Sequence, residues 1–118
     1  MKTETQLRAE VYNAITSIAT VSWLSKPTTS DAFPLMTYQL LSSSSEYSFG
    51  VVRSAEDRAF QIDLYVAPDD IVNGDNKLDA IKTAMENIDY RQSGSTAEFL
   101  DTDLNKVIKV TRWERYNV

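Results

Sequence analysis

The chain has 118 residues, 42% of them hydrophobic and 25% charged, which is ordinary for a globular protein, so we expect one domain over residues 1–118. It contains neither cysteine nor histidine, which excludes disulfides, thiol chemistry and the commonest metal ligand, and its net charge of −5 disfavours non-specific binding to nucleic acid. No apolar run approaches the roughly 18 residues of a membrane span, and the first residues lack the apolar stretch of a signal peptide, so we expect action in the cytosol and no membrane contact.

The first predicted element is a helix from Thr3 to about Ala19. Thr3 and Gln6 match a capping box, in which both side chains satisfy free backbone N–H groups at the start of a helix. Apolar residues then recur at helical spacing, at Leu7, Val11, Ala14, Ile15 and Ile18. The β-branched run after residue 18 predicts the end of this helix.

Two strands are predicted next. A short one contains Val21 and Trp23, and a second follows Phe33–Pro34, with Met36, Tyr38 and Leu40 pointing to one side. The serine-rich stretch from 42 to about 56 breaks the pattern. We interpret it as a long hairpin connection to the following strand.

The clearest strand covers 59–67. Its even positions, Phe60, Ile62, Leu64 and Val66, are apolar and its odd positions are mostly polar, which indicates a sheet with one covered face. The sequence 73–75 is predicted to be a turn, and a second helix is predicted from about Asn76 to Tyr90, capped by Asp75 or Asn76.

The last predicted strand covers 105–113, where β-branched residues favour a strand over a helix. The stretch 98–104 before it is acidic and is predicted to be a loop. These elements predict an α+β fold, a mostly antiparallel sheet of about four strands with two helices packed on one face.

Patterns that would indicate catalysis are weak. The three glycines are far apart, which excludes the known phosphate-binding loops, and Ser25–Lys26 is an isolated pair. The segment 69–74 has the glycine of a calcium loop but lacks two of its ligands. Paired carboxylates at Asp101 and Asp103, or Asp63 beside Tyr65, are better explained as solvated groups. We therefore expect no enzyme activity, no catalytic residue, no cofactor and no metal.

Trp113 lies between Arg112 and Arg115, a pattern that can stack single-stranded nucleic acid. Because the chain is acidic overall, we interpret Trp113 instead as sheet packing or as an anchor in a protein interface. The basic C-terminal segment and the acid-rich stretch 57–79 could orient one subunit against another, or could simply be solvated surface.

Four segments carry a resemblance to a known family: Leu7 to Tyr12, Phe33 to Gln39, Phe60 to Tyr65, and Asp101–Asp103 with Lys106–Val110. In order, spacing and total length they resemble the small tail-completion proteins of long-tailed bacteriophages, the tail-to-head joining and tail-terminator group. None of the four segments is a catalytic motif. The ending after Trp113 is longer and more polar than this family leads us to expect.

The resemblance implies a structural virion protein. Such a protein forms a hexameric ring that caps the tail tube, attaches it to the head connector and lets DNA pass through its lumen without specific binding. We place acidic residues toward this lumen, because a channel that passes DNA should not bind phosphate. It would be found in the virion at the head-proximal end of the tail, and in the host cytoplasm during assembly. The expected partners are other copies of the chain, the tail tube protein and the head–tail connector protein. The expected contact residues are Ser44, Ser45, Glu46, Tyr47, Phe49, Glu98, Asp101, Asp103 and Trp113.

Two alternatives remain open at this point. The chain could be a small cytosolic adaptor of the same fold that binds another protein. Less favoured is a hydrolase with an oxygen-only metal site, in which Asp63 would be required.

Overall fold

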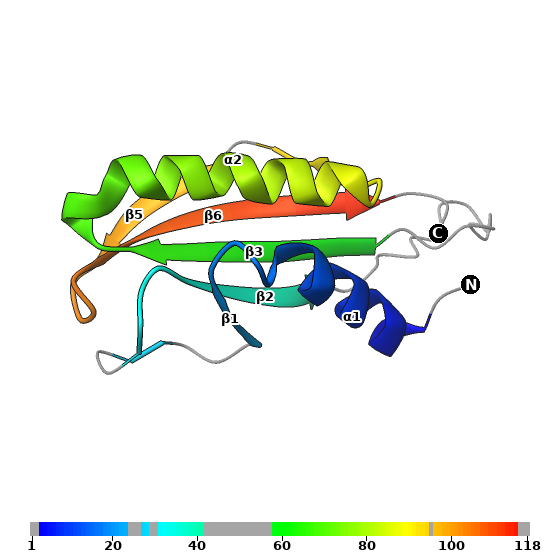
Figure 1. Ribbon diagram of the computed structural model, residues 1–118, viewed down its shortest axis with the longest axis horizontal. Helices are drawn as coiled ribbons and strands as arrows, with labels where there is room; N and C mark the ends of the chain where they lie inside the picture. Colours follow the sequence, from blue (N-terminus) through cyan, green and yellow to red (C-terminus); the bar gives the residue numbers. More distant parts are fainter. Residues whose placement is uncertain (1–2, 24–26, 29–30, 42–57, 95, 116–118) are drawn as a thin grey trace, which may run out of the picture.

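The computed structural model describes residues 3–23, 27–28, 31–41, 58–94 and 96–115. The helices and strands follow the order α1 (Glu4–Ile15), β1 (Thr20–Trp23), β2 (Leu35–Leu41), β3 (Arg58–Val66), a 3-10 turn (Pro68–Asp70), α2 (Ile71–Asn87), β4 (Arg91–Gln92), β5 (Ala97–Asp101) and β6 (Lys106–Arg115). They form one sheet in the order β1-β2-β3-β6-β4, and β5 also pairs with β6. Figure 1 shows α2 lying along β3 and β6.

The fold is α+β, as the sequence predicts, but the prediction of about four strands is wrong. Among the described residues the sheet has six strands and is mixed, because β1 runs parallel to β2 while the other four strand pairs are antiparallel. The parallel pair brings Thr20 opposite Leu35 and Trp23 opposite Tyr38. The two strands that the sequence did not reveal, β4 and β5, both pair with the edge of β6 that β3 leaves open.

Helix α1 begins with the predicted capping box. The Thr3 backbone N–H donates to Gln6 Oε1 at 2.9 Å, and the Gln6 N–H donates to Thr3 Oγ1 at 3.2 Å. The helix ends at Ile15, earlier than predicted, because Thr20 already pairs with β2. Arg115 Nη1, 2.6 Å from Glu10 Oε1, ties the end of β6 to this helix.

Helix α2 begins at Ile71, so the predicted turn at 73–75 and the predicted cap at Asp75 or Asn76 are wrong. Gly74 lies inside the helix, where it is buried against the sheet. A Cβ atom at Gly74 would be 3.0 Å from Val66 Cγ2 and 3.2 Å from Lys109 Cε. The glycine that suggested a turn therefore lets the first turns of α2 approach β3 and β6 closely.

We expect Gly74→Leu to lower the free energy of unfolding by about 1–3 kcal/mol, because the added side chain would have to push α2 away from Val66. Urea unfolding followed by circular dichroism measures this change. Ala80→Leu, at an exposed position on the same helix, is the control and should change stability little. Equal stability of the two variants would contradict the close packing at Gly74.

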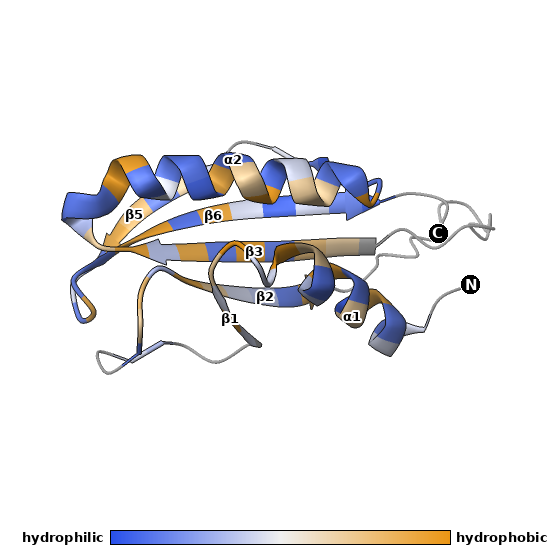
Figure 2. Cartoon of the chain, viewed as in Figure 1, coloured by the Kyte–Doolittle hydropathy of each residue, from blue (hydrophilic) through white to orange (hydrophobic). Residues whose placement is uncertain are grey.

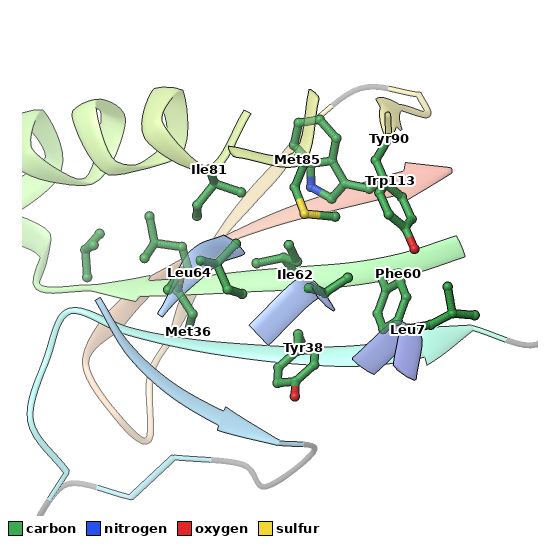
Figure 3. Packing of buried hydrophobic residues seen from close by; sticks show 13 residues of the cluster. Leu7, Met36, Tyr38, Phe60, Ile62, Leu64, Ile81, Met85, Tyr90 and Trp113 are labelled. Carbon is green, nitrogen blue, oxygen red and sulfur yellow. The ribbon is translucent and has the colours of Figure 1, made fainter. Parts of the chain in front are cut away.

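The main core lies between the sheet and both helices. Figure 3 shows side chains from α1, α2, β2, β3 and β6 meeting on this one face. The even positions of β3 point into it, as predicted, and its fully buried members include Leu7, Val11, Ile15, Met36, Phe60, Ile62, Leu64, Val66, Ile81, Met85, Tyr90 and Trp113. The Phe60 and Tyr90 rings meet edge to face with centroids 5.9 Å apart.

The opposite face of the sheet is only partly covered. A smaller buried cluster there contains Leu35, Tyr65, Leu104 and Ile108, with Phe33 and Val110 packed against it. Because Leu104 comes from the turn between β5 and β6, this cluster holds the β5–β6 hairpin against the rest of the sheet.

Candidate functional site

Strand β5 forms an outer edge of the sheet. It pairs antiparallel with β6, from Ala97 opposite Val110 to Asp101 opposite Lys106. Within the described part of the chain, no strand pairs with its other side. An edge strand of this kind presents backbone N–H and C=O groups that another chain can pair with. We call β5, its turn to β6 and the first turns of α2 the β5 edge.

A tight turn closes the β5–β6 hairpin. Asp101 Oδ1 accepts the backbone N–H of Asp103 at 3.0 Å and that of Leu104 at 3.1 Å. Asn105 adopts a φ of 51°, a left-handed conformation that asparagine tolerates better than most residues. The prediction of a loop at 98–104 is therefore wrong: residues 98–101 belong to strand β5, and the turn that follows is built around the Asp101 carboxylate.

A buried lysine joins β5 to helix α2. Lys109 Nζ lies 2.8 Å from Asp75 Oδ1 on α2 and 2.8 Å from Glu98 Oε1 on β5, and only 5% of its side chain is exposed. Burial lowers the pKa of Lys109, but the hydrogen bonds and attraction from Asp75 and Glu98 outweigh burial and raise that pKa overall. Glu98 therefore has a structural role at this edge, and no pattern in the sequence predicts that role.

Large apolar side chains are exposed at the β5 edge. Among the described residues the exposed large hydrophobic side chains are Tyr12, Val72, Phe99 and Leu100, and all but Tyr12 belong to this edge. Val72 is 75% exposed, while Phe99 and Leu100 are each about half exposed. Figure 2 shows hydrophobic residues on β5 and on the start of α2 at the same end of the molecule.

The register divides these side chains between the two faces of the sheet. Phe99 is opposite Ile108 and so lies on the face of the smaller cluster, whereas Leu100 is opposite Val107 on the helix face. Val72 lies one helical turn before Asp75, and Leu100 lies two residues after Glu98. Helix α2 runs in the same direction as β6, and β5 runs in the opposite direction. Val72 and Leu100 are therefore displaced from Lys109 toward the same end of the sheet, and they lie toward the same end of α2 and β5.

No protein-family model matches this chain, and a search of the curated proteins finds no significant match.

The predicted contact residues fall into three groups, of which the third is Trp113 alone. Glu98, Asp101 and Asp103 come together at the β5 edge, where Asp103 is exposed. Ser44, Ser45, Glu46, Tyr47 and Phe49 lie outside the described residues. The sequence did not single out Val72, Phe99 or Leu100, because exposed apolar residues cannot be told from core residues without knowing burial.

Trp113 is not a surface residue of this chain. It is 1% exposed in the main core, and its Nε1 donates to Thr111 Oγ1 at 2.8 Å. Thr111 in turn donates its hydroxyl to the Ile62 carbonyl at 3.0 Å. This burial agrees with the interpretation of Trp113 as sheet packing. It does not agree with the interpretation of Trp113 as an anchor in a protein interface.

Asp63 and Tyr65 lie on the face of the sheet away from the helices. The Asp63 carboxylate accepts a hydrogen bond from Gln61 Nε2 at 3.1 Å. Burial raises the pKa of Asp63, and the Gln61 hydrogen bond offsets only part of that effect. Among the described residues no three acidic side chains gather as metal ligands would, and no described helix is long and apolar enough to cross a membrane.

We expect Asp63→Asn to raise the free energy of unfolding at pH 7. The raised pKa means that the folded protein holds the Asp63 proton more tightly than the unfolded chain does. The charged carboxylate therefore costs stability above the folded-state pKa, and that cost disappears as the pH falls below the unfolded value near 3.8. Urea unfolding of both proteins at neutral and at acidic pH measures the gain in stability from Asp63→Asn. An equally large gain at both pH values would show that the charge of Asp63 is not its cause.

A polar hollow lies at the other end of α2, beside β4. It is lined by Lys82, Glu86, Asp89, Tyr90, Arg91 and Gln92. Both signs of charge are represented, so the lining does not select an anion or a cation. The β5 edge is the better candidate for a functional surface, and its chemistry is that of protein contact.

Proposed function

We propose that the protein is a structural subunit that completes the tail of a long-tailed bacteriophage. In this role it forms a ring at the end of the tail tube, stops further growth of the tube and joins it to the head connector. The single observation that carries the proposal is the open β5 edge with exposed Phe99 and Leu100. The order of segments that resembles tail-completion proteins supports it.

The β5 edge suits a protein that works by assembly. A ring is built from heterologous contacts, in which one patch of each subunit meets a different patch on the next. An unpaired strand supplies backbone hydrogen-bonding groups for such a contact, and exposed Val72, Phe99 and Leu100 supply apolar area. The contact is made to protein, so the function needs binding energy and no chemical step.

The charge of the chain suits a channel through which DNA passes. With 17 acidic and 12 basic residues, the subunit repels phosphate more than it attracts it. We place acidic residues toward the lumen, the tail tube protein and the connector protein on the two sides of the ring, and the finished ring in the virion. Assembly takes place in the host cytoplasm.

The proposal is tested by removing the gene from the phage that encodes it. Electron microscopy of the lysate should show filled heads and separate tails, and supplying the protein from a plasmid should restore joined, infectious particles. Normal particles without the protein would overturn the proposal and favour a cytosolic adaptor of the same fold.

Light scattering of the purified protein over a concentration series tests ring formation in solution. A hexamer of the 13.3 kDa chain is the species expected once the concentration is high enough. If the chain stays monomeric, the ring must instead be formed on the tail end, and mixing with purified tails should then produce it. Failure of the protein to bind tails as well would contradict ring assembly.

A further inference from the structure

We propose that strand β5 of one subunit pairs with strand β1 of the next copy, so that the sheets of neighbouring subunits join edge to edge around the ring. This inference rests on the assembly role proposed above and names the two patches that form its subunit contact. The open side of β5 is thus covered by a second copy of this chain, which binds through a different strand.

The sheet has an open edge on each side. Strand β1 is the last strand on one side, and β5 lies beyond β6 on the other. Within the described residues, β1 pairs only with β2, and β5 pairs only with β6. The two edges are similar in length, with four residues in β1 and five in β5. An open edge of this kind can accept a strand of another chain through main-chain hydrogen bonds.

The directions of the two edge strands suit antiparallel pairing. Strand β1 runs parallel to β2, and along the series β2, β3, β6 and β5 each strand is antiparallel to the one before it. Strand β1 therefore runs opposite to β5 (Figure 1). Rotation about an axis along the strands keeps their direction and keeps the helices on the same side of the sheet. A ring of this symmetry brings β1 antiparallel to β5 of the next copy, which is the slightly more stable pairing.

The faces of the sheet favour one register. Val21 packs against the main core and so lies on the helix face, as Leu100 does. Residues directly opposite each other in an antiparallel pair share a face, so Val21 can be opposite either Leu100 or Glu98. Leu100 is half exposed, whereas Glu98 is held by the buried lysine, so apolar contact favours Leu100. This register also places Ser22 opposite Phe99 on the other face.

The two edges are complementary in charge. Strand β1 contains no charged residue, whereas β5 contains Glu98 and Asp101. In the register above Asp101 is opposite Thr20, whose hydroxyl can donate to a carboxylate. At the same end of β1, Lys77 Nζ lies 2.7 Å from the carbonyl oxygen of Ile18 and adds a positive charge. A second β5 strand would offer neither this hydroxyl nor this lysine.

The absence of cysteine from the chain allows a direct test of the contact by disulfide formation. Ser22→Cys together with Phe99→Cys should, under mild oxidation, link neighbouring copies into a ladder of covalent multimers on a denaturing gel without reductant. Within one subunit, β2, β3 and β6 lie between the two positions. At about 4.8 Å between neighbouring strands the separation is about 19 Å, which is too far for an internal disulfide.

Two control variants accompany the double variant. Phe99→Cys alone should stay monomeric on the gel, because it can form a disulfide only if two β5 strands meet. Ser22→Cys with Thr83→Cys, an exposed position on α2, also carries two cysteines and should give no ladder. Oxidation is carried out on the concentrated protein and on the protein mixed with purified tails, so that a ring formed only on a tail is also detected.

Leu100→Glu should weaken association of the subunits by about tenfold or more, because it removes the apolar contact with Val21. Thr83→Glu carries the same change in net charge and should leave association within about twofold. Light scattering, or the amount of protein bound to purified tails, measures both variants. Neither position is buried, so circular dichroism should show both variants folded.

Two results would overturn the inference. One is the absence of a ladder both in the concentrated protein and on tails, and the other is a dimer linked through Phe99→Cys alone, which would make a second β5 strand the occupant. If a ring still forms without the ladder, the strand pairing fails and the tail role stands. A ladder together with normal particles after gene removal would leave the β1–β5 contact standing and the tail role refuted.

Discussion

Trp113→Ala is expected to lower the free energy of unfolding by about 3–5 kcal/mol. Among the described residues Trp113 is the largest of the fully buried side chains, and in the sheet it is directly opposite Phe60. Its removal leaves a cavity in the main core, and the Nε1 hydrogen bond to Thr111 is lost. Urea unfolding followed by circular dichroism measures the change, and Trp113→Phe should recover much of the loss because it keeps most of the apolar volume.

Val72→Ala is the control for this experiment. Val72 is largely exposed, so its truncation should change stability by no more than about 0.5 kcal/mol. If Trp113→Ala were as stable as Val72→Ala, the tryptophan would not be a core residue. That result would favour the interpretation of Trp113 as an anchor in a protein interface.

The second large effect concerns the lysine between α2 and β5. Replacing both of its carboxylate partners, in Asp75→Ala with Glu98→Ala, is expected to lower the free energy of unfolding by about 3 kcal/mol, because an uncompensated ammonium is left in a buried place. Lys109→Met should cost clearly less, since methionine fills a similar volume and carries no charge to be desolvated. Urea unfolding of both variants gives the comparison, and a greater loss in Lys109→Met would contradict the account.

The same site predicts a dependence on pH. Because the folded state raises the pKa of Lys109, the stability gained from its ion pairs is fully present below the unfolded value of 10.5 and is lost as the pH rises through the folded value. Lys109→Met should therefore flatten the fall in stability at alkaline pH. An unchanged alkaline profile in this variant would show that another group is responsible.

Local signals in the sequence were sufficient for some elements. The capping box at Thr3 and Gln6 depends only on neighbouring residues, and it marks the start of α1 correctly. The alternation in β3 predicts one covered face, and its even positions, Phe60, Ile62, Leu64 and Val66, do lie in the main core. In both cases the residues that carry the signal are also the residues that make the contacts.

Other elements depended on contacts between distant residues. Asn73-Gly74-Asp75 reads as a turn, but close packing of Gly74 on Val66 and Lys109 places it in a helix. The parallel pairing of β1 with β2 is a contact between two separate strands, and the alternation of residues within each strand does not predict it. Strand β5 is exposed on both faces, so it lacks the alternation by which buried strands are predicted.

The candidate site was found only in part from the sequence. Its acidic residues Glu98, Asp101 and Asp103 were proposed for contacts, but as members of a loop, and the lysine that holds Glu98 was not foreseen. Val72 is far from them in the sequence and joins the site only because Asp75, one turn away, reaches the same lysine as Glu98. A surface assembled from α2 and β5 cannot be identified before their packing is known.

The most direct test of the tail-completion role is the position of the protein in the virion. Gold particles carrying an antibody against the chain should label purified particles at the junction between head and tail, and partly disrupted particles should keep the label on the head-proximal end of the tail. Label at the distal tip, on the head shell, or absent from particles altogether would contradict the role.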